Sequence, residues 1–335
     1  MKFRTELVAI VAGLATIGLL AGCSSTPANT TPSNASADSK ITIGVSFDIT
    51  GAFRTAEKDA ITKAAEAKGD KVIFDVAGGD AQKQASQIQD LIQTQKVDAI
   101  IAIAQNADQI TGSIALAKAS KVPFIALDRG VTNSKDVAFQ VTGDPVSDGM
   151  LAGKEALAAG GSGKLDVMQL VGALTDKNAI GRRDGFAKTI GAASNAKLKT
   201  DVPMNWDPAT ALAGTSNALV KSPGINVIFI PSDFLLPTIV SALKTANRFF
   251  PAGDPKHIVL VTIDGDQDGC VAVKDGTQDA DIATAVGEFG IEAVAAAHTA
   301  VAGEAIAKKI VTVPSVVLDA KNYATASPNV WGCNV

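Results

Sequence analysis

The feature of the sequence that most constrains its fold is a regular alternation of short apolar segments and longer amphipathic segments, which begins at Lys40. Apolar runs of about four to eight residues are typical of buried strands, and apolar residues at every third or fourth position are typical of helices. Strands that alternate with helices form parallel sheets, because a parallel connection needs a long crossover. We therefore expect an α/β fold with parallel sheets and helices on both faces of each sheet.

The alternation occurs twice along the chain. In the first series, we expect strands over residues 41–47, 71–76, 98–104 and 122–127, and helices over residues 53–68, 80–96 and 108–120. In the second series, we expect strands over residues 164–170, 225–230 and 257–263, and helices over residues 146–159, 178–191, 207–221 and 234–247. Because 335 residues are enough for about two domains, each series is predicted to form one lobe.

Residues 1–22 have the pattern of an export signal. A short, positively charged region precedes an apolar run over residues 7–20, and small residues then lead to Cys23. This order is typical of secretory signals, and the cysteine after the small residues resembles a bacterial lipoprotein signal, in which Cys23 is lipidated. The alternative is an uncleaved membrane anchor, for which the apolar run is short. Residues 23–39 are polar and contain proline, which predicts a flexible tether.

Composition and motifs exclude several classes of protein. The net charge of -4 argues against a general nucleic-acid-binding protein, and three cysteines and two histidines leave little for a four-ligand zinc site. The glycine-rich stretch at residues 160–163 matches neither a dinucleotide fingerprint nor a phosphate loop, and no Gly-x-Ser-x-Gly elbow occurs. His257 and His298 are predicted to be structural or surface residues. We therefore expect no cofactor, no metal and no catalytic residue.

Polar loops follow the predicted strands, and in an open α/β sheet ligands meet these loops at the carboxyl ends of the strands. The loops are rich in Asp, Asn, Arg and Ser and cover residues 46–54, 104–108, 127–129, 174–182, 231–233 and 264–266. Carboxylates accept hydrogen bonds from hydroxyl groups, and a guanidinium group donates several in a fork. The loops therefore predict a neutral, hydroxyl-rich ligand.

Three motifs in these regions are the most specific: VPFIALDR at residues 122–129, GRRDGF at 181–186 and IDG at 263–265. With the rest of residues 40–319, they resemble the ribose-type periplasmic sugar-binding proteins, which are the substrate-binding components of ABC importers. The resemblance implies the type 1 periplasmic binding protein fold, with two Rossmann-like lobes joined by a hinge of three crossovers.

The resemblance also implies the boundaries of the lobes. The crossovers are expected near residues 142–144, 286–288 and 312–314. The N-terminal lobe then comprises residues 40–142 and 287–313, and the C-terminal lobe comprises residues 143–286 and 314–335.

The resemblance assigns sites residue by residue. By position, the side chains that contact sugar hydroxyls are Asp128, Arg129, Arg182 and Asp264, and the rings that stack on the sugar are Phe53 and Trp206. Each has a structural alternative: a local ion pair for the first two, a solvated helix face for Arg182, a helix cap for Asp264 and core packing for the rings. Three further candidates, which loop capping explains equally well, are Asp48, Asn106 and Asp233.

Two cysteines remain after Cys23, and an exported protein can form disulfides. In the resembling family, the end of the chain returns to the second lobe, which also holds the segment around Cys270. A disulfide between Cys270 and Cys333 is therefore implied. The alternative is two free, buried thiols.

The function implied by the resemblance is a monomeric, extracytoplasmic binding protein that is anchored by lipid to the outer face of the bacterial cell membrane. It would close around one small carbohydrate, a monosaccharide or polyol, and deliver it to a permease that a cytoplasmic ATPase powers. An exported carbohydrate-active enzyme is an alternative, for which Asp128 and Asp264 could supply the two carboxylates. A sugar chemoreceptor component is another alternative, and a sugar-responsive repressor is disfavoured by the export signal.

Overall fold

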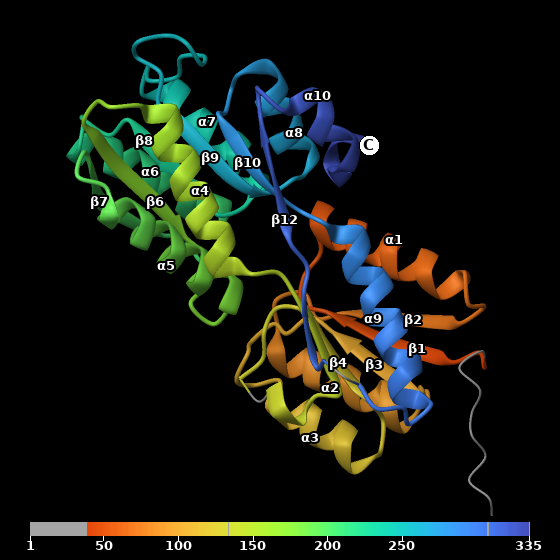
Figure 1. Ribbon diagram of the computed structural model, residues 1–335. Coiled ribbons are helices and arrows are strands. Elements are labelled where there is room, and N and C mark those ends of the chain that lie inside the picture. The colour runs from red at the N-terminus through yellow and green to blue at the C-terminus, as the bar shows by residue number, and fades with distance from the viewer. Residues whose placement is uncertain (1–38, 133, 307, 335) are drawn as a thin grey trace, which may run out of the picture. The chain divides into compact units, whose positions relative to one another are not determined.

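The computed structural model describes residues 39–132, 134–306 and 308–334. The predicted export signal over residues 1–22, Cys23 and almost all of the predicted tether lie outside these residues. The described chain forms two sheets of six strands, and helices alternate with the strands in both (Figure 1). The expected α/β fold with two mostly parallel sheets is therefore confirmed.

The first sheet and the helices on it form what we call the N-terminal lobe. Its strand order is β11-β5-β4-β3-β1-β2, and all neighbouring strands are parallel. The strands are β1 (Thr42–Phe47), β2 (Lys71–Val76), β3 (Ala99–Ala102), β4 (Phe124–Asp128), β5 (Phe139–Thr142) and β11 (Ile310–Thr312). The helices are α1 (Ala52–Glu66), α2 (Ala81–Gln93), α3 (Thr111–Ala119) and α9 (Val286–Val301). One face of the sheet packs against α1 and α9, and the other packs against α2 and α3.

The second sheet and its helices form the C-terminal lobe. Its strand order is β12-β10-β9-β8-β6-β7, and only the β10–β12 pair is antiparallel. The strands are β6 (Leu165–Val171), β7 (Ala196–Pro203), β8 (Val227–Phe229), β9 (Val259–Asp264), β10 (Ala280–Thr284) and β12 (Ser315–Asp319). The helices are α4 (Pro145–Gly160), α5 (Lys177–Ala192), α6 (Pro208–Lys221), α7 (Leu236–Thr245), α8 (Gln267–Asp275) and α10 (Tyr323–Ala326). Helices α4 and α5 cover one face of the sheet, and α6 and α7 cover the other.

The chain passes between the two sheets three times: between β5 and α4, between β10 and α9, and between β11 and β12. These passages fall in residues 142–145, 284–286 and 312–315. The crossovers expected from the sequence lie at or beside these residues, and the exact lobe boundaries stay a prediction.

Several helices begin at an aspartate that caps the first turn. In each case the carboxylate accepts a hydrogen bond from a backbone N–H of the helix, which stabilises the otherwise unpaired N-terminus. The capping residues are Asp80, Asp144, Asp176, Asp207 and Asp266. Two of them, Asp176 and Asp266, follow strands β6 and β9 and also line the cavity. These capping bonds hold their side chains in place beside the cleft described below.

The sequence prediction differs from the structure at the edges of the sheets. Strands β5, β7, β10, β11 and β12 were not among the expected strands. In β7, buried or half-buried residues alternate with exposed ones, so the strand lacks the continuous apolar run of a central strand. The predicted helix over residues 234–247 instead begins as a 3-10 turn at Asp233–Leu235, and α7 follows from Leu236.

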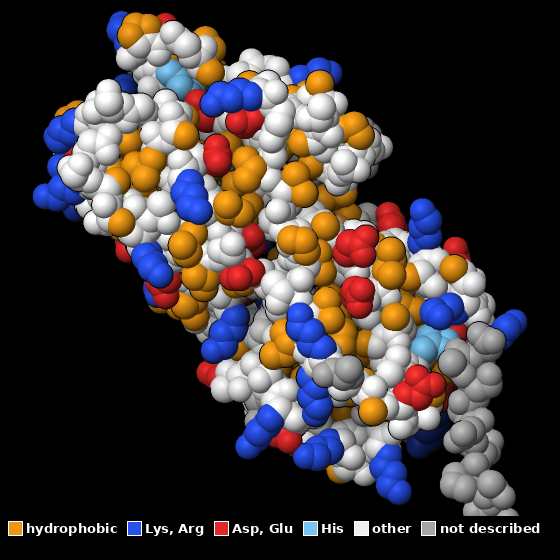
Figure 2. All heavy atoms as spheres, viewed as in Figure 1, with side chains coloured by type: hydrophobic (Ala, Val, Ile, Leu, Met, Phe, Trp, Pro, Cys, Tyr) orange, Lys and Arg blue, Asp and Glu red, His pale blue; other side chains and the backbone are white. Residues whose placement is uncertain are grey.

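The described part of the chain contains no helix that is both long and apolar enough to span a bilayer. Figure 2 shows one face of the molecule, on which basic and acidic side chains both occur on the two lobes.

Candidate functional site

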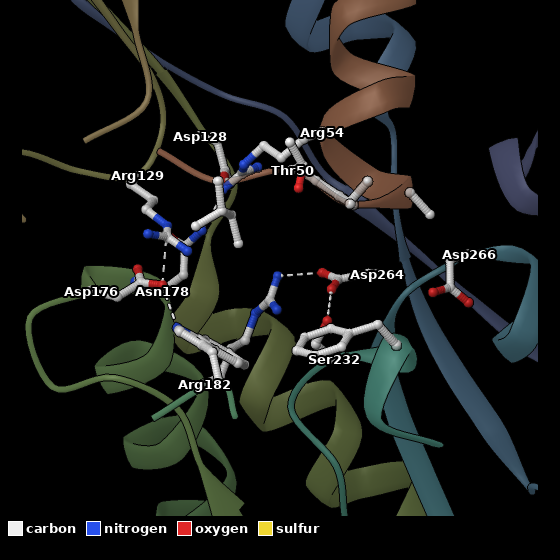
Figure 3. Close-up of a pocket in the computed structure, with 16 residues that line it drawn as sticks. Thr50, Arg54, Asp128, Arg129, Asp176, Asn178, Arg182, Ser232, Asp264 and Asp266 are labelled. Carbon is white, nitrogen blue, oxygen red and sulfur yellow. Dashed lines mark hydrogen bonds and ion pairs between the residues drawn. The ribbon is translucent and has the colours of Figure 1, made fainter. Parts of the chain in front are cut away.

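The two lobes enclose a cavity of about 380 Å³, which lies at the carboxyl ends of strands from both sheets (Figure 3). The N-terminal lobe lines it with residues 49–54, Asp128 and Arg129. The C-terminal lobe lines it with Asp176, Asn178, Arg182, Trp206, Ser232, Phe234, Asp264 and Asp266. Six of the predicted ligand residues are therefore brought together: Phe53, Asp128, Arg129, Arg182, Trp206 and Asp264.

Asp128 ends strand β4 and adopts a φ of 56°, in the left-handed region that non-glycine residues visit rarely. Its carboxylate is held from two sides. An Oδ2 atom lies 2.9 Å from a guanidinium nitrogen of Arg54 in α1, and Oδ1 accepts a hydrogen bond of 2.8 Å from the Asn178 side chain in α5. Asp128 thus joins the two lobes at the wall of the cavity.

Arg129 makes a second connection between the lobes. One terminal nitrogen lies 2.7 Å from Asp48 in the N-terminal lobe, and Nε lies 3.1 Å from Asp176 in the C-terminal lobe. All three side chains are at least nine-tenths buried, so the ion pairs are shielded from water. This geometry fixes the plane of the Arg129 guanidinium group beside the cavity.

Arg54 was not predicted as a site residue, although it lines the cavity and organises the N-terminal side of it. Its guanidinium group contacts Asp48 at 2.7 Å, Glu57 at 2.5 Å and Asp128 at 2.9 Å. Burial would raise the pKa of Asp48, but the Arg54 and Arg129 guanidinium groups outweigh burial and lower that pKa. For Glu57, burial dominates and raises the pKa to about 8, against the opposing effect of Arg54. The signal in the sequence was an arginine followed by a glutamate three residues later in the first turns of a helix.

On the C-terminal side, Arg182 of α5 is bonded to two loops. Its terminal nitrogens donate to the Pro231 carbonyl oxygen and to Oδ1 of Asp264, both at 2.7 Å. The Ser232 hydroxyl donates to the other carboxylate oxygen of Asp264. Burial raises the pKa of Asp264, and the charge of Arg182 and the Ser232 hydrogen bond oppose this rise.

Aromatic rings complete the wall. Trp206 adopts a φ of 63°, and its indole N–H donates to Asp176 at 3.1 Å. A Cβ on Gly172 would lie 2.3 Å from the Trp206 ring, so glycine at that position leaves room for the ring. The Phe234 ring lies 6.4 Å from the Trp206 ring, between centroids. On the opposite side, Phe53 contributes a ring from the start of α1.

Three predicted candidates do not line the cavity: Asp48, Asn106 and Asp233. Asp48 is fully buried behind the wall and pairs with two of the lining arginines. Asn106 accepts hydrogen bonds from the backbone of Asp108 and Gln109 in the loop before α3. Asp233 is also fully buried and accepts hydrogen bonds from the backbone N–H groups of the 265–266 turn at 2.7 and 2.8 Å. In this structure, Asp48 therefore neutralises arginines of the cavity wall, and Asn106 and Asp233 stabilise loops.

Two polar atoms of the lining residues have unused hydrogen-bonding capacity. Within the part of the chain that the structure describes, Oδ1 of Asn178 and Nε of Arg182 are buried without a protein partner. One is an acceptor and the other is a donor. A buried polar group without a partner costs free energy, so each has a reason to bond to a ligand or to water. Asn178 and Asp176 lie in one of the predicted polar loops but were not among the predicted site residues.

The sequence of the chain is similar to those of known binding proteins. The sequence model of a periplasmic binding protein domain matches residues 43–305. The chain belongs to this family. The ribose import binding protein RbsB of Haemophilus influenzae is 29% identical over 279 residues, which cover 83% of this chain and 91% of the relative. The xylitol-binding protein of Mycolicibacterium smegmatis is 30% identical over 284 residues, which cover 82% of this chain and 75% of the relative.

Two solved structures agree with this one in fold. A Mycobacterium smegmatis protein in complex with β-D-fucofuranose has a TM-score of 0.78 and 26% identity, and the match covers 86% of this chain and 94% of that protein. An ABC transporter solute-binding protein of Mycobacterium smegmatis with bound glycerol has a TM-score of 0.77 and 24% identity, over 85% of this chain and 96% of that protein. The predicted fold and the resemblance to ribose-type binding proteins are confirmed. The two relatives named are binding proteins, one of them for ribose import, and not enzymes.

Proposed function

We propose that this periplasmic binding protein is the extracytoplasmic substrate-binding protein of an ABC importer, and that it binds one small carbohydrate, a monosaccharide or polyol, in the cavity between its lobes. The observation that carries the proposal is the wall of that cavity. Within about 380 Å³, carboxylates, guanidinium groups and an amide are held in fixed positions beside aromatic rings. Donors, acceptors and apolar rings together match a molecule whose edges carry hydroxyl groups and whose faces carry C–H groups.

The charges of the wall favour a neutral ligand over an anionic one. Three arginines line the cavity, Arg54, Arg129 and Arg182, and each is already paired with a buried carboxylate. An anionic ligand would have to compete with these carboxylates. A hydroxyl group can accept a hydrogen bond from a guanidinium group and donate one to a carboxylate without displacing either group.

The names of the relatives support the same class of ligand. The relatives named above are a ribose import binding protein and a xylitol-binding protein, and a solved structure of similar fold holds β-D-fucofuranose. Their ligands are a pentose, a polyol and a furanose. A neutral, hydroxyl-rich molecule of this size is therefore the class that we propose for this chain.

The mechanism follows from the contacts between the lobes. A ligand that bonds to Asp128 on one lobe and to Arg182 on the other is bound best when the lobes are closed, so binding shifts the hinge toward closure. We propose that the closed, monomeric protein delivers its ligand to a membrane permease driven by an ATPase. We also propose that Cys23, which lies outside the described residues, carries the lipid that holds the protein at the outer face of the membrane.

A panel of carbohydrates tests the proposal. Purified protein is heated with D-ribose, xylitol, myo-inositol, D-fucose, L-arabinose or glycerol, and the unfolding temperature is measured, because a ligand of the native state raises it by mass action. We expect at least one panel member to raise the unfolding temperature and to bind with a stoichiometry of one in calorimetry. Asp128→Ala should abolish the shift, whereas Asp184→Ala, an exposed charge outside the cavity wall, should preserve it. No shift with any panel member would contradict the proposal, and turnover of a chromogenic glycoside would favour the enzyme alternative.

A further inference from the structure

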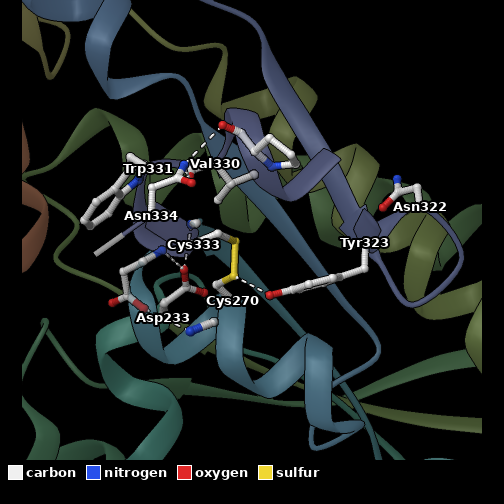
Figure 4. Close-up of a disulfide and its surroundings, with 12 residues drawn as sticks. Asp233, Cys270, Asn322, Tyr323, Val330, Trp331, Cys333 and Asn334 are labelled. Carbon is white, nitrogen blue, oxygen red and sulfur yellow. Dashed lines mark hydrogen bonds between the residues drawn. A yellow bond between two sulfur atoms is a disulfide. The ribbon is translucent and has the colours of Figure 1, made fainter. Parts of the chain in front are cut away.

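The C-terminal segment of the chain ends beside the cavity. After α10, two 3-10 turns, Ser327–Asn329 and Trp331–Asn334, end the described chain. A disulfide joins Cys333 in the last turn to Cys270 in α8, across 63 residues of sequence (Figure 4). The pairing implied by the resemblance is therefore present in the structure. It fastens the end of the chain to the helix that follows the 264–266 turn.

The segment packs directly on that turn, which supplies Asp264 and Asp266 to the cavity wall. The indole N–H of Trp331 donates to the Asp264 carbonyl oxygen at 2.9 Å, and the Gly332 N–H donates to the Gly265 carbonyl oxygen at 3.0 Å. A Cβ on Gly332 would lie 2.1 Å from the Asp266 carbonyl carbon, so the two backbones approach too closely for any larger residue.

The conformation of the turn needs such support. Asp264 has a φ of 123°, a backbone conformation that side-chain-bearing residues rarely adopt and that costs free energy unless the surroundings impose it. From one side, the Asp233 carboxylate accepts the N–H groups of Gly265 and Asp266. From the other side, the C-terminal segment bonds to the carbonyl oxygens of Asp264 and Gly265 through Trp331 and Gly332, as described above.

The same segment reaches the other lobe. The Trp331 ring meets the ring of Phe53 edge to face, with centroids 5.8 Å apart and an interplanar angle of 82°. Phe53 lies at the start of α1 in the N-terminal lobe and lines the cavity. Aromatic pairs in this geometry gain more free energy than their buried area alone provides. Trp331 therefore favours the arrangement in which the lobes are together.

We propose that residues 330–333, anchored by the Cys270–Cys333 disulfide, are a positioning element of the ligand cavity. The element holds the Asp264–Asp266 turn in its binding conformation and presents Trp331 to Phe53, so that the closed arrangement of the lobes depends on the end of the chain. Trp331 is a positioning residue, because it is not among the residues that line the cavity. The predicted effect on ligand affinity rests on the proposed function. The predicted packing of Trp331 against the turn and Phe53 does not depend on any ligand.

The first experiment measures affinity. D-Ribose, xylitol and myo-inositol are titrated calorimetrically into the wild-type protein, Trp331→Ala, Trp331→Phe and the control Tyr323→Phe. Trp331→Ala removes both the ring pair and the hydrogen bond and should weaken binding by about tenfold or more. Trp331→Phe keeps a ring opposite Phe53 and should recover part of that loss. Tyr323→Phe removes a hydroxyl that contacts Cys270 at 3.2 Å but no residue of the turn, and it should bind like the wild type.

The second experiment needs no ligand. The chain has two tryptophans, so Trp206→Phe leaves Trp331 as the one fluorescent indole. Reduction of the disulfide in this variant should shift the Trp331 emission to longer wavelength and increase its quenching by acrylamide, with the far-ultraviolet circular dichroism unchanged. The doubly substituted Cys270→Ala/Cys333→Ala protein should show the same emission without reductant.

The outcomes separate this proposal from the proposed function. If no panel member binds the wild-type protein, the proposed function is wrong, and the Trp331 emission alone decides the role of the segment. Unchanged emission after reduction would overturn the proposal. So would a Trp331→Ala protein that binds D-ribose, xylitol or myo-inositol as tightly as the wild type, or one whose affinity falls only in step with its unfolding temperature.

Discussion

The substitution Asn178→Asp tests the contact that joins the two lobes at the cavity. In the structure, the buried Asn178 amide donates to Oδ1 of Asp128 across the cleft, at 2.8 Å. The replacement has almost the same shape but turns the donor into a carboxylate. Two carboxylates then face each other wherever the lobes are closed, and the repulsion is relieved when the lobes open.

The size of the effect follows from this geometry. Two unit charges about 4 Å apart interact by about 4 kcal/mol at an effective dielectric constant of about 20. The lost hydrogen bond adds about 1 kcal/mol. Partial opening of the cleft relieves some of this energy, so we expect a loss of about 3 to 4 kcal/mol in binding, which is roughly a 100- to 1,000-fold rise in Kd. Asn178→Ala removes only the hydrogen bond and should raise Kd roughly tenfold.

The assay is calorimetric titration with the tightest-binding member of the carbohydrate panel between pH 5 and pH 8. Asn195→Asp adds the same charge at a half-buried position outside the cavity wall, where the amide donates to backbone carbonyls, and should bind ligand normally throughout. Equal deficits for Asn178→Asp and Asn178→Ala at every pH would refute the reasoning.

Three further predictions concern stability and stacking. Because burial raises the pKa of Glu57 to about 8, the folded protein binds a proton at Glu57 that the unfolded chain has already lost, so the free energy of unfolding falls as pH rises from about 4.5 to 8; Glu57→Gln has no titrating group at this position and should flatten this slope in urea titrations. Gly269→Ala would place a Cβ 2.6 Å from carboxylate oxygens of Asp233 and Asp281 and should lower the unfolding free energy by about 1–3 kcal/mol. Trp206→Ala should raise the calorimetric Kd about tenfold or more, because a half-buried ring is lost from the cavity wall.

Much of the fold could be predicted from the sequence because the central strands are continuous apolar runs. Residues 99–102 and 124–128 are buried throughout, and short apolar runs of this kind are typical of central parallel strands. Edge strands lack this signal. Strand β7 keeps lysines on its exposed side, and β11 has only three residues, so neither stands out from a loop. Their place in the sheets depends on pairing with distant strands, which no local pattern encodes.

The candidate site could be predicted only in part for a similar reason. Asp128 and Arg182 lie in sequence motifs, and both line the cavity. Arg54 and Asn178 were missed because their significance comes from partners in other elements: Arg54 bonds to the end of β4, and Asn178 bonds across the cleft. For Asp233 the sequence predicted too much. A polar loop after a strand suggests a ligand contact, whereas the Asp233 carboxylate accepts hydrogen bonds from two backbone N–H groups of a neighbouring turn.

The central claim is that one small carbohydrate binds between the lobes, and a crystal structure of the protein with the tightest-binding panel member tests it most directly. We expect a single molecule in the cavity, with Phe53 and Trp206 beside its ring or carbon chain and with its hydroxyl groups bonded to Asp128, Arg182 and Asp264. A carbohydrate bound outside this cavity, or bound to one lobe alone with these three side chains still paired only to protein, would contradict the claim.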